Sequence, residues 1–116
     1  MFLNKLVLES ISDSKYILKD DLVAQVDGKY YTVPKGFITD LASVPYPLNK
    51  WIKSDNSKYL KSAVMHDFFY VSQMDRKKAD DLFLLLMESE NTPRRYKYSF
   101  YLAVRLFGWI RYKKGN

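Results

Sequence analysis

Cysteine is absent from the 116-residue sequence, which excludes disulfide bonds and thiolate metal sites. The sequence also lacks a long apolar run, and the longest one, Leu82–Met87, is far too short to span a bilayer. Residues 1–10 contain Lys5 and Glu9 and no long apolar core, so they do not resemble a signal peptide. These absences favour a protein that is made without a secretory signal and that folds in a reducing compartment.

Acidic residues are outnumbered by basic ones, 13 against 19, and the formal net charge is +6. Such a charge favours anionic partners, namely phospholipid head groups, nucleic acid or an acidic protein, although solubility alone also explains it. Apolar residues make up 47% of the chain, a share that predicts a folded core and not disorder. The length suits one domain, so we expect residues 1–116 to form a single domain.

The pattern along the chain predicts an α+β fold, in which a small N-terminal antiparallel sheet or hairpin is followed by three helices. Residues 1–14 are weakly patterned and predict an edge strand or an arm, whereas residues 15–33 show the alternation of strands. Within them, Asp27-Gly28 is typical of a hairpin turn. Residues 37–48 combine small and polar side chains with prolines, which predicts an ordered loop.

Three helices are expected after the sheet and loop of residues 1–48, at about 57–72, 76–90 and 94–113. A short polar link joins the first two, which should form an antiparallel pair. Asp75 is a good N-cap for the second helix, and the continuous apolar run of this helix predicts that it is central. The third helix is rich in aromatic and basic residues. Its apolar face predicts either packing on the other helices or contact with a membrane surface.

The only histidine, His66, is the centre of the candidate catalytic site. Tyr70 follows four residues later, so both rings project from one side of the first helix. Asp80 falls in the first turns of the second helix, where an antiparallel arrangement places it across from both rings. We expect His66 to bond to Asp80 or Tyr70, because a carboxylate facing an imidazole fixes the ring tautomer for proton transfer. The same contacts also suit a purely structural histidine.

Two further carboxylates, Asp67 and Asp40, are candidate metal ligands. Asp67 falls on the predicted buried stripe of the first helix, where burial without a partner would cost about 3–5 kcal/mol. We expect each carboxylate to meet a cation, a metal or backbone N–H groups, with Arg105 as the favoured cation. A calcium ion needs about six to eight oxygen ligands, and two carboxylates supply few of them.

The remaining polar candidates have expected structural roles. Thr39, Asp40 and Ser43 are each suited to bonding backbone N–H groups and thereby holding the loop. Ser43 lacks the flanking glycines of a nucleophile elbow, so nothing nearby marks it as a nucleophile. Arg76 precedes Asp80 by four residues, and the alternative role of Asp80 is therefore a surface ion pair worth about 0.3–0.5 kcal/mol.

Short motifs follow one another over most of the chain, in the order Gly36-Phe37, Thr39-Asp40, Ala42-Ser43, Pro45, Ala63, His66-Asp67, Tyr70, Arg76, Ala79-Asp80, Phe83, Val104-Arg105 and Gly108-Trp109. This pattern resembles a family of short phage- and prophage-encoded proteins that is catalogued as a domain of unknown function. The resemblance implies phage origin more than any chemistry. It leads us to expect synthesis in the host cytoplasm and a place in the virion.

Residues 63–87 are also similar to the helix pair of secreted phospholipases that cleave the sn-2 ester. By this resemblance His66 would be the general base, Asp80 would orient it and Tyr70 would support Asp80. Asp67 would bind calcium. Those enzymes carry a glycine-rich calcium loop before the His-Asp helix, which this chain lacks, and Asp40 is the only evident substitute.

These observations favour a phage virion or tail-assembly component, with other phage structural proteins as partners and a structural cluster of His66, Asp67 and Asp80. The alternative is a small hydrolase, either phospholipase-like or acting on cell-envelope esters or amides, with His66 as general base. A second alternative is a basic module that binds a host molecule or nucleic acid.

Overall fold

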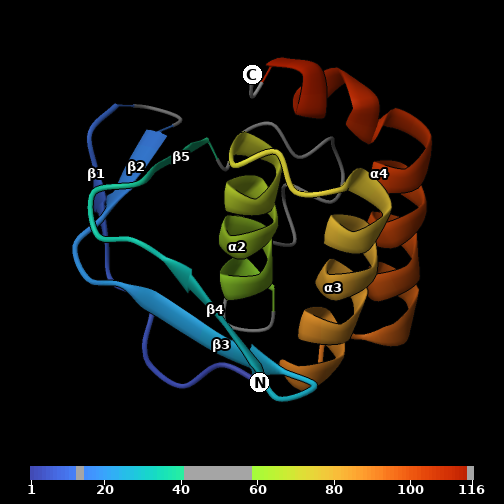
Figure 1. Ribbon diagram of the computed structural model, residues 1–116, viewed down its shortest axis with the longest axis horizontal. Coiled ribbons are helices and arrows are strands. Elements are labelled where there is room, and N and C mark those ends of the chain that lie inside the picture. The colour runs from blue at the N-terminus through green and yellow to red at the C-terminus, as the bar shows by residue number, and fades with distance from the viewer. Residues whose placement is uncertain (13–14, 41–58, 115–116) are drawn as a thin grey trace.

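The computed structural model describes residues 1–12, 15–40 and 59–114, which form an α+β fold of antiparallel strands followed by three helices, as predicted. In Figure 1 the strands lie on one side of the molecule and two of the helices lie on the other. Helix α2 (Leu60–Val71) runs between these two layers. This central helix carries His66, so the elements on both sides of it position the candidate site.

The three-stranded sheet contains β1 (Leu8–Ser10), β2 (Lys15–Leu18) and β5 (Ile38–Asp40), in that order, with antiparallel pairing throughout. The weakly patterned N-terminal residues therefore provide an edge strand. The segment predicted as a loop from residue 37 onward begins as a strand instead, because Thr39 pairs with β2. The rest of that predicted loop, with Ser43, lies outside the described residues.

A separate two-stranded sheet is formed by β3 (Leu22–Val26) and β4 (Lys29–Val33). The turn between them has positive φ angles of 51° at Asp27 and 79° at Gly28. These angles match the type I′ turn that Asp-Gly favours, so the predicted hairpin is confirmed. Alternate residues of β3 point into the core, where Leu22 and Ala24 have no exposed surface.

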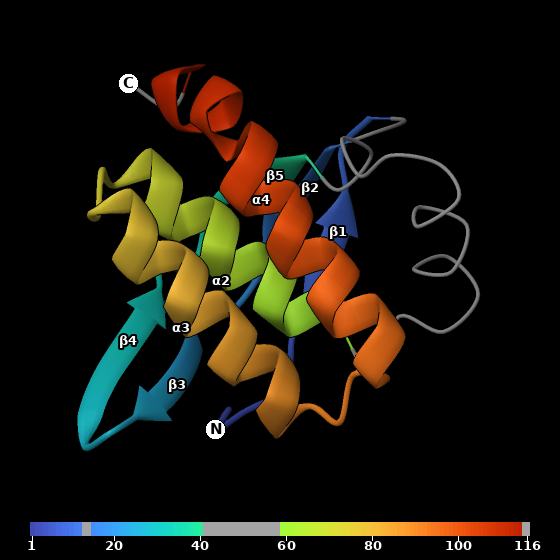
Figure 2. The ribbon, with the colours of Figure 1, turned by 90° about the vertical axis from the view of Figure 1, so that its right-hand side faces the viewer.

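Helix α3 (Arg76–Ser89) begins after Asp75, whose side chain accepts a hydrogen bond from Lys78 N–H at 3.1 Å, as the predicted N-cap requires. Helix α4 (Arg94–Lys114) then runs back antiparallel to α3 (Figure 2). Within the described ranges, no helix combines the length and the apolar character that a membrane crossing requires.

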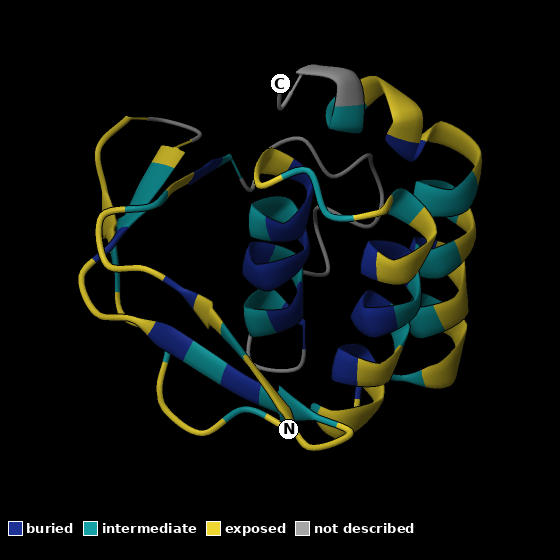
Figure 3. Ribbon diagram, viewed as in Figure 1, coloured by how far each residue is buried: buried dark blue, intermediate teal, exposed yellow. Residues whose placement is uncertain are grey.

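The prediction that the second helix is central is confirmed in part: α3 packs against both α2 and α4, while α2 lies between the strands and the other helices. Figure 3 shows buried residues on two sides of α2, toward the strands and toward the other helices. Leu85 of α3, by contrast, is 43% exposed, so the apolar run of α3 is not buried all round. The single buried stripe predicted for α2 is wrong. Val71, which belongs to that stripe, is 44% exposed, whereas Met65 and Phe69, which lie outside it, are buried. A helix packed on two sides has no single apolar stripe.

The first turn of α2 is completed by a side chain from the far end of α3. Tyr59 at the N-cap position makes no side-chain capping bond. Glu90 instead accepts hydrogen bonds at its Oε1 from the Ser62 N–H at 2.9 Å and from the Ser62 hydroxyl at 2.5 Å. Burial raises the pKa of Glu90, and the two bonds from Ser62 oppose that rise. Glu90 thus satisfies an N–H group that the helix itself leaves unpaired.

We expect Glu90→Ala to lower the free energy of unfolding by about 1–2 kcal/mol, because Ser62 N–H loses its acceptor. Glu90→Gln keeps a carbonyl oxygen at the same position and should retain most of the stability. Urea unfolding followed by circular dichroism measures both changes. Equal midpoints for Glu90→Ala and the wild type would show that the contact contributes nothing to α2.

Candidate functional site

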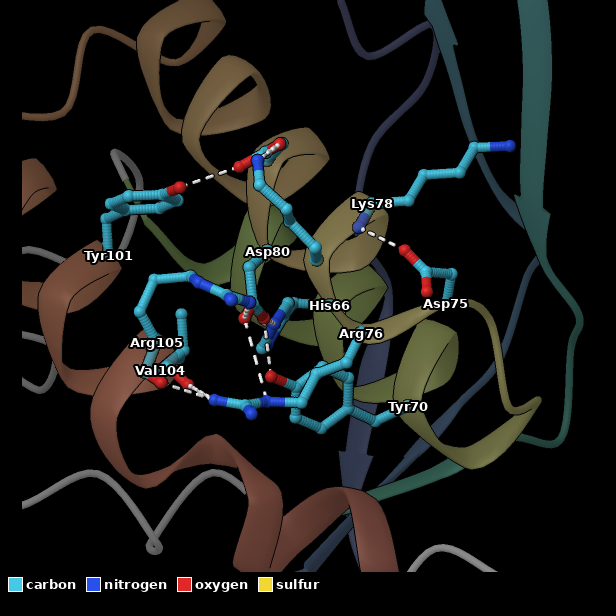
Figure 4. A network of polar contacts seen from close by, with 11 residues as sticks. His66, Tyr70, Asp75, Arg76, Lys78, Asp80, Tyr101, Val104 and Arg105 are labelled. Atoms are coloured by element: carbon cyan, nitrogen blue, oxygen red, sulfur yellow. Dashed lines mark hydrogen bonds and ion pairs between the residues drawn. The ribbon is translucent and has the colours of Figure 1, made fainter.

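The carboxylate of Asp80 is fully buried between the three helices, and the bond predicted between His66 and Asp80 is present (Figure 4). Its Oδ1 lies 2.8 Å from His66 Nε2 and accepts a hydrogen bond from the Tyr70 hydroxyl at 2.5 Å. Both rings come from α2, one turn apart, and face Asp80 on the first turns of α3. The i, i+4 spacing on one helix and the antiparallel course of the next account for this meeting.

The second oxygen of Asp80, Oδ2, accepts a hydrogen bond from Arg105 Nη1 of α4 at 2.7 Å. Arg76 Nε lies 3.9 Å from the same oxygen and, although it is buried, has no hydrogen-bond partner among the residues that the structure describes. The far end of the Arg76 guanidinium donates to the carbonyl oxygens of Val104 and Arg105 on α4. The expected i, i+4 ion pair of Arg76 and Asp80 is present, but its surface location is wrong, because Asp80 is buried and Arg76 also holds the α4 backbone.

Asp67 has different partners from those expected. Its Oδ2 accepts a hydrogen bond from the Thr39 hydroxyl at 2.8 Å, and Arg111 Nη2 lies 3.1 Å from Oδ1. Arg105, the cation expected for Asp67 or Asp40, instead serves Asp80. Thr39 is buried, as its contact with Asp67 requires, while Asp67 itself is only half-buried. No local signal in the sequence singles out Arg111 from the other cations of α4.

The surroundings of Asp67 fit a guanidinium better than calcium. One oxygen takes the Thr39 hydroxyl and the other takes Arg111, which already supplies the compensating charge. Asp40 ends β5, where it is half-buried and paired in register with Lys15 of β2. Among the residues that the structure describes, no three His, Asp or Glu side chains gather as metal ligands do. An arginine thus meets Asp67 in the described structure, and the metal-ligand role of Asp67 and Asp40 stays a prediction.

The imidazole of His66 is enclosed by aromatic rings. It stacks on Phe83 at 4.4 Å between ring centroids and lies 4.3 Å from the Tyr70 ring. One tenth of the side-chain surface remains exposed. Nε2 is held by Asp80, and within the described part of the chain no hydrogen bond reaches Nδ1. The arrangement thus fixes Nε2 of the ring through Asp80.

Burial lowers the pKa of His66, and the hydrogen bond and charge of Asp80 oppose that fall only in part. Burial alone would raise the pKa of Asp80, but the bonds from His66, Tyr70 and Arg105 bring it below its usual value. The cluster therefore holds a neutral imidazole against an ionised carboxylate near neutral pH. Because the folded pKa of His66 lies below 6.5, its contribution to stability is complete above pH 6.5 and is lost as pH falls toward the folded value.

Helix α4 meets the other two helices through a row of carboxylates. Each contact joins a hydrogen-bond donor of α4 to an acidic side chain of α2 or α3, and we call this row the carboxylate ladder. Its members are Lys97 with Glu88 at 3.7 Å, Tyr101 with Asp81 at 2.6 Å, Arg105 with Asp80 at 2.7 Å and Arg111 with Asp67 at 3.1 Å.

Fold and site together define a small α+β protein with a His-Asp cluster buried between three helices. A family model described as "Protein of unknown function (DUF1353)" matches residues 16–104, and the chain belongs to this family. His66, Tyr70 and Asp80 fall within the matched residues, whereas Arg105 lies just beyond them. No curated protein and no solved structure matched the chain. The predicted membership of a family of unknown function is confirmed at this level, without a chemistry attached.

Gly108 of α4 lies against the ring of Tyr70. A Cβ atom placed on Gly108 would collide with the Tyr70 hydroxyl, which is the group that bonds to Asp80. We expect Gly108→Ala to lower the free energy of unfolding by about 1–3 kcal/mol. The higher helix propensity of alanine, worth about 1 kcal/mol, opposes that loss.

Tyr70→Phe is the matched control, because it removes the colliding oxygen and keeps the ring. In the Tyr70→Phe background, Gly108→Ala should cost clearly less than in the wild type. Urea unfolding of the four proteins measures this coupling. Strict additivity of the two changes would contradict the contact.

Proposed function

We propose that the protein is a small hydrolase in which His66 acts as the general base on a water molecule. The observation that carries the proposal is the bond of 2.8 Å between His66 Nε2 and Asp80 Oδ1. Tyr70 and Arg105 lower the pKa of Asp80 further, so the carboxylate is ionised and holds the proton of the ring on Nε2. The lone pair of Nδ1 is then the basic position, and the lowered pKa of His66 keeps it unprotonated near neutral pH.

The proposed reaction is hydrolysis of a carboxylic ester or amide. Nδ1 of His66 takes a proton from water while the water oxygen forms a bond to the carbonyl carbon. The tetrahedral intermediate then breaks its bond to the alcohol or amine, which leaves with the proton that His66 had accepted. Asp80 stabilises the imidazolium that exists between these two transfers. The products are a carboxylic acid and an alcohol or amine, and no electron is gained or lost.

Arg111 is the proposed source of positive charge for the developing oxyanion. Its charge acts on the imidazole, because it is one of the causes that lower the pKa of His66. Asp67 fixes the guanidinium at 3.1 Å, and Thr39 in turn fixes Asp67. A held cation next to the general base is the arrangement that stabilises charge in a transition state. The proposal therefore gives Asp67 a positioning role and routes no step through calcium.

Hydrolysis of short-chain esters and of phospholipid in mixed vesicles tests the proposal. We expect His66→Ala and Asp80→Asn each to reduce the rate roughly 100-fold or more, as removal of a general base does. Asp81→Asn is the matched control, because Asp81 adjoins Asp80 in sequence but bonds to Lys77 and Tyr101. The rate should fall only below pH 6.5, because the pKa of His66 is lowered. Assays with calcium and with a chelator should agree; equal rates for wild type and His66→Ala would refute the proposal.

A virion or tail-assembly component of a phage is the second candidate, and one observation favours it. The Asp80 carboxylate on α3 is bonded by His66 and Tyr70 of α2 and by Arg105 of α4, so it ties the three helices together. A cluster of this kind is useful to a structural protein without any reaction. In this role the partners are other phage structural proteins, and the chain is packaged after synthesis in the host cytoplasm.

The structural role has its own expected outcome. Asp80→Asn should lower the free energy of unfolding by about 1–3 kcal/mol, because a buried network loses its charged acceptor. Each kcal/mol corresponds to a melting temperature lower by about 4–8 °C in a domain of up to 100 residues. Mass spectrometry of purified particles should find the chain in a fixed ratio to the other virion proteins. Its absence from the particles would exclude the second candidate.

A further inference from the structure

The outward face of α4 carries a row of large, exposed apolar side chains. Tyr98, Leu102, Leu106 and Trp109 are each between 47% and 58% exposed, and we call them the outer stripe. Their spacing of three or four residues places them along one side of the helix. Figure 3 shows this side of α4 as largely exposed, facing away from α2 and α3.

The charge of α4 complements an anionic partner. The helix contains no Asp or Glu at all, and its basic residues are Arg94, Arg95, Lys97, Arg105, Arg111, Lys113 and Lys114. On its inner face Lys97, Arg105 and Arg111 are held by carboxylates of the other helices. Arg94 and Arg95 at its start are exposed, and Arg94 lies 5.8 Å from the ring of Tyr98 in the outer stripe.

We propose that α4 docks flat on an anionic membrane surface, with the outer stripe in the boundary between head groups and acyl chains. Trp and Tyr suit this boundary because their rings are apolar and each has one polar group, and Leu102 and Leu106 supply the apolar contact between them. The ionic contacts of the inner face keep α4 on the protein, so the helix binds as a fixed ridge. This inference is independent of the proposed hydrolysis, because no residue of the outer stripe takes part in that reaction.

A second copy of the chain fits the outer stripe less well. Both ends of α4 are basic in sequence, with Arg94 and Arg95 at the start and Lys113 and Lys114 at the end. Two copies that paired along this helix would bring like charges together at each end, in a parallel or an antiparallel arrangement. Head groups of phosphatidylglycerol or phosphatidylserine instead supply negative charge along the whole helix.

Co-sedimentation of the full-length protein with vesicles tests the docking. One set contains phosphatidylcholine alone, and the other contains equal parts of phosphatidylcholine and phosphatidylglycerol. We expect binding to the mixed vesicles only, weakened by salt. The double variant Leu106→Glu/Trp109→Glu should bind mixed vesicles at least roughly tenfold more weakly than the wild type. Ile38→Glu is the matched control, because Ile38 is also about half exposed but lies on β5, on the strand side of the molecule.

Thermal unfolding checks that the variants fold, and Arg94→Glu/Arg95→Glu repeats the test without touching the stripe. Fluorescence of a Trp51→Phe variant, in which Trp109 is the remaining tryptophan, should shift to shorter wavelength on mixed vesicles. Equal binding of the wild type to both vesicle sets would overturn the proposal. Equal binding of the wild type and of Leu106→Glu/Trp109→Glu to the mixed vesicles would also overturn it. So would a dimer that the stripe variant abolishes, or binding to oligonucleotides in place of vesicles.

Discussion

A buried carboxylate needs hydrogen-bond donors that replace water, and the donors to Asp80 come from the two other helices. Removing one partner of such a buried group typically costs about 3–5 kcal/mol, so its contacts are strongly constrained. His66 and Tyr70 can reach Asp80 only if α2 and α3 are antiparallel and correctly rotated. Arg105 can reach it only when α4 lies along both. The Asp80 contacts therefore restrict the relative position of the three helices, in addition to the apolar contacts between them.

The same charge allows two uses of the histidine, and burial of the ring decides its protonation state. An Asp80 paired only with His66 would attract a proton to the imidazole and raise its pKa. Burial of the ring outweighs the hydrogen bond and charge of Asp80, so the pKa of His66 is lowered. A neutral imidazole is what a general base requires, and it is also what a buried structural residue requires. Activity and stability measurements on one variant therefore separate the two roles better than either alone.

Local patterns in the sequence were sufficient to predict those elements that are determined by residues close together in the sequence. Asp27 and Gly28 determined the hairpin, Asp75 began α3, and the four-residue spacing of His66 and Tyr70 placed both rings before Asp80. The phage origin and the roles of these residues stay predictions.

Contacts between distant segments were not predictable in the same way. Aromatic and basic residues occur on every side of α4, so the sequence does not fix its rotation, and Arg105 and Arg111 could not be assigned to Asp80 and Asp67. The cap that Glu90 provides to Ser62 joins residues 28 positions apart, which no local pattern announces. The buried stripe of α2 was misjudged because strands and helices cover it from two sides.

The carboxylate ladder restricts the position of α4 along its own axis. Sliding the helix by one turn would move its donors by about 5.4 Å and separate every pair at once. A smaller shift of α4 would separate Arg105 from Asp80, and rotation of α4 about its axis would separate Arg111 from Asp67. We therefore expect the four contacts of the carboxylate ladder to be lost together when α4 moves along its axis. A small force along the axis of α4 would then be opposed by all four contacts at once.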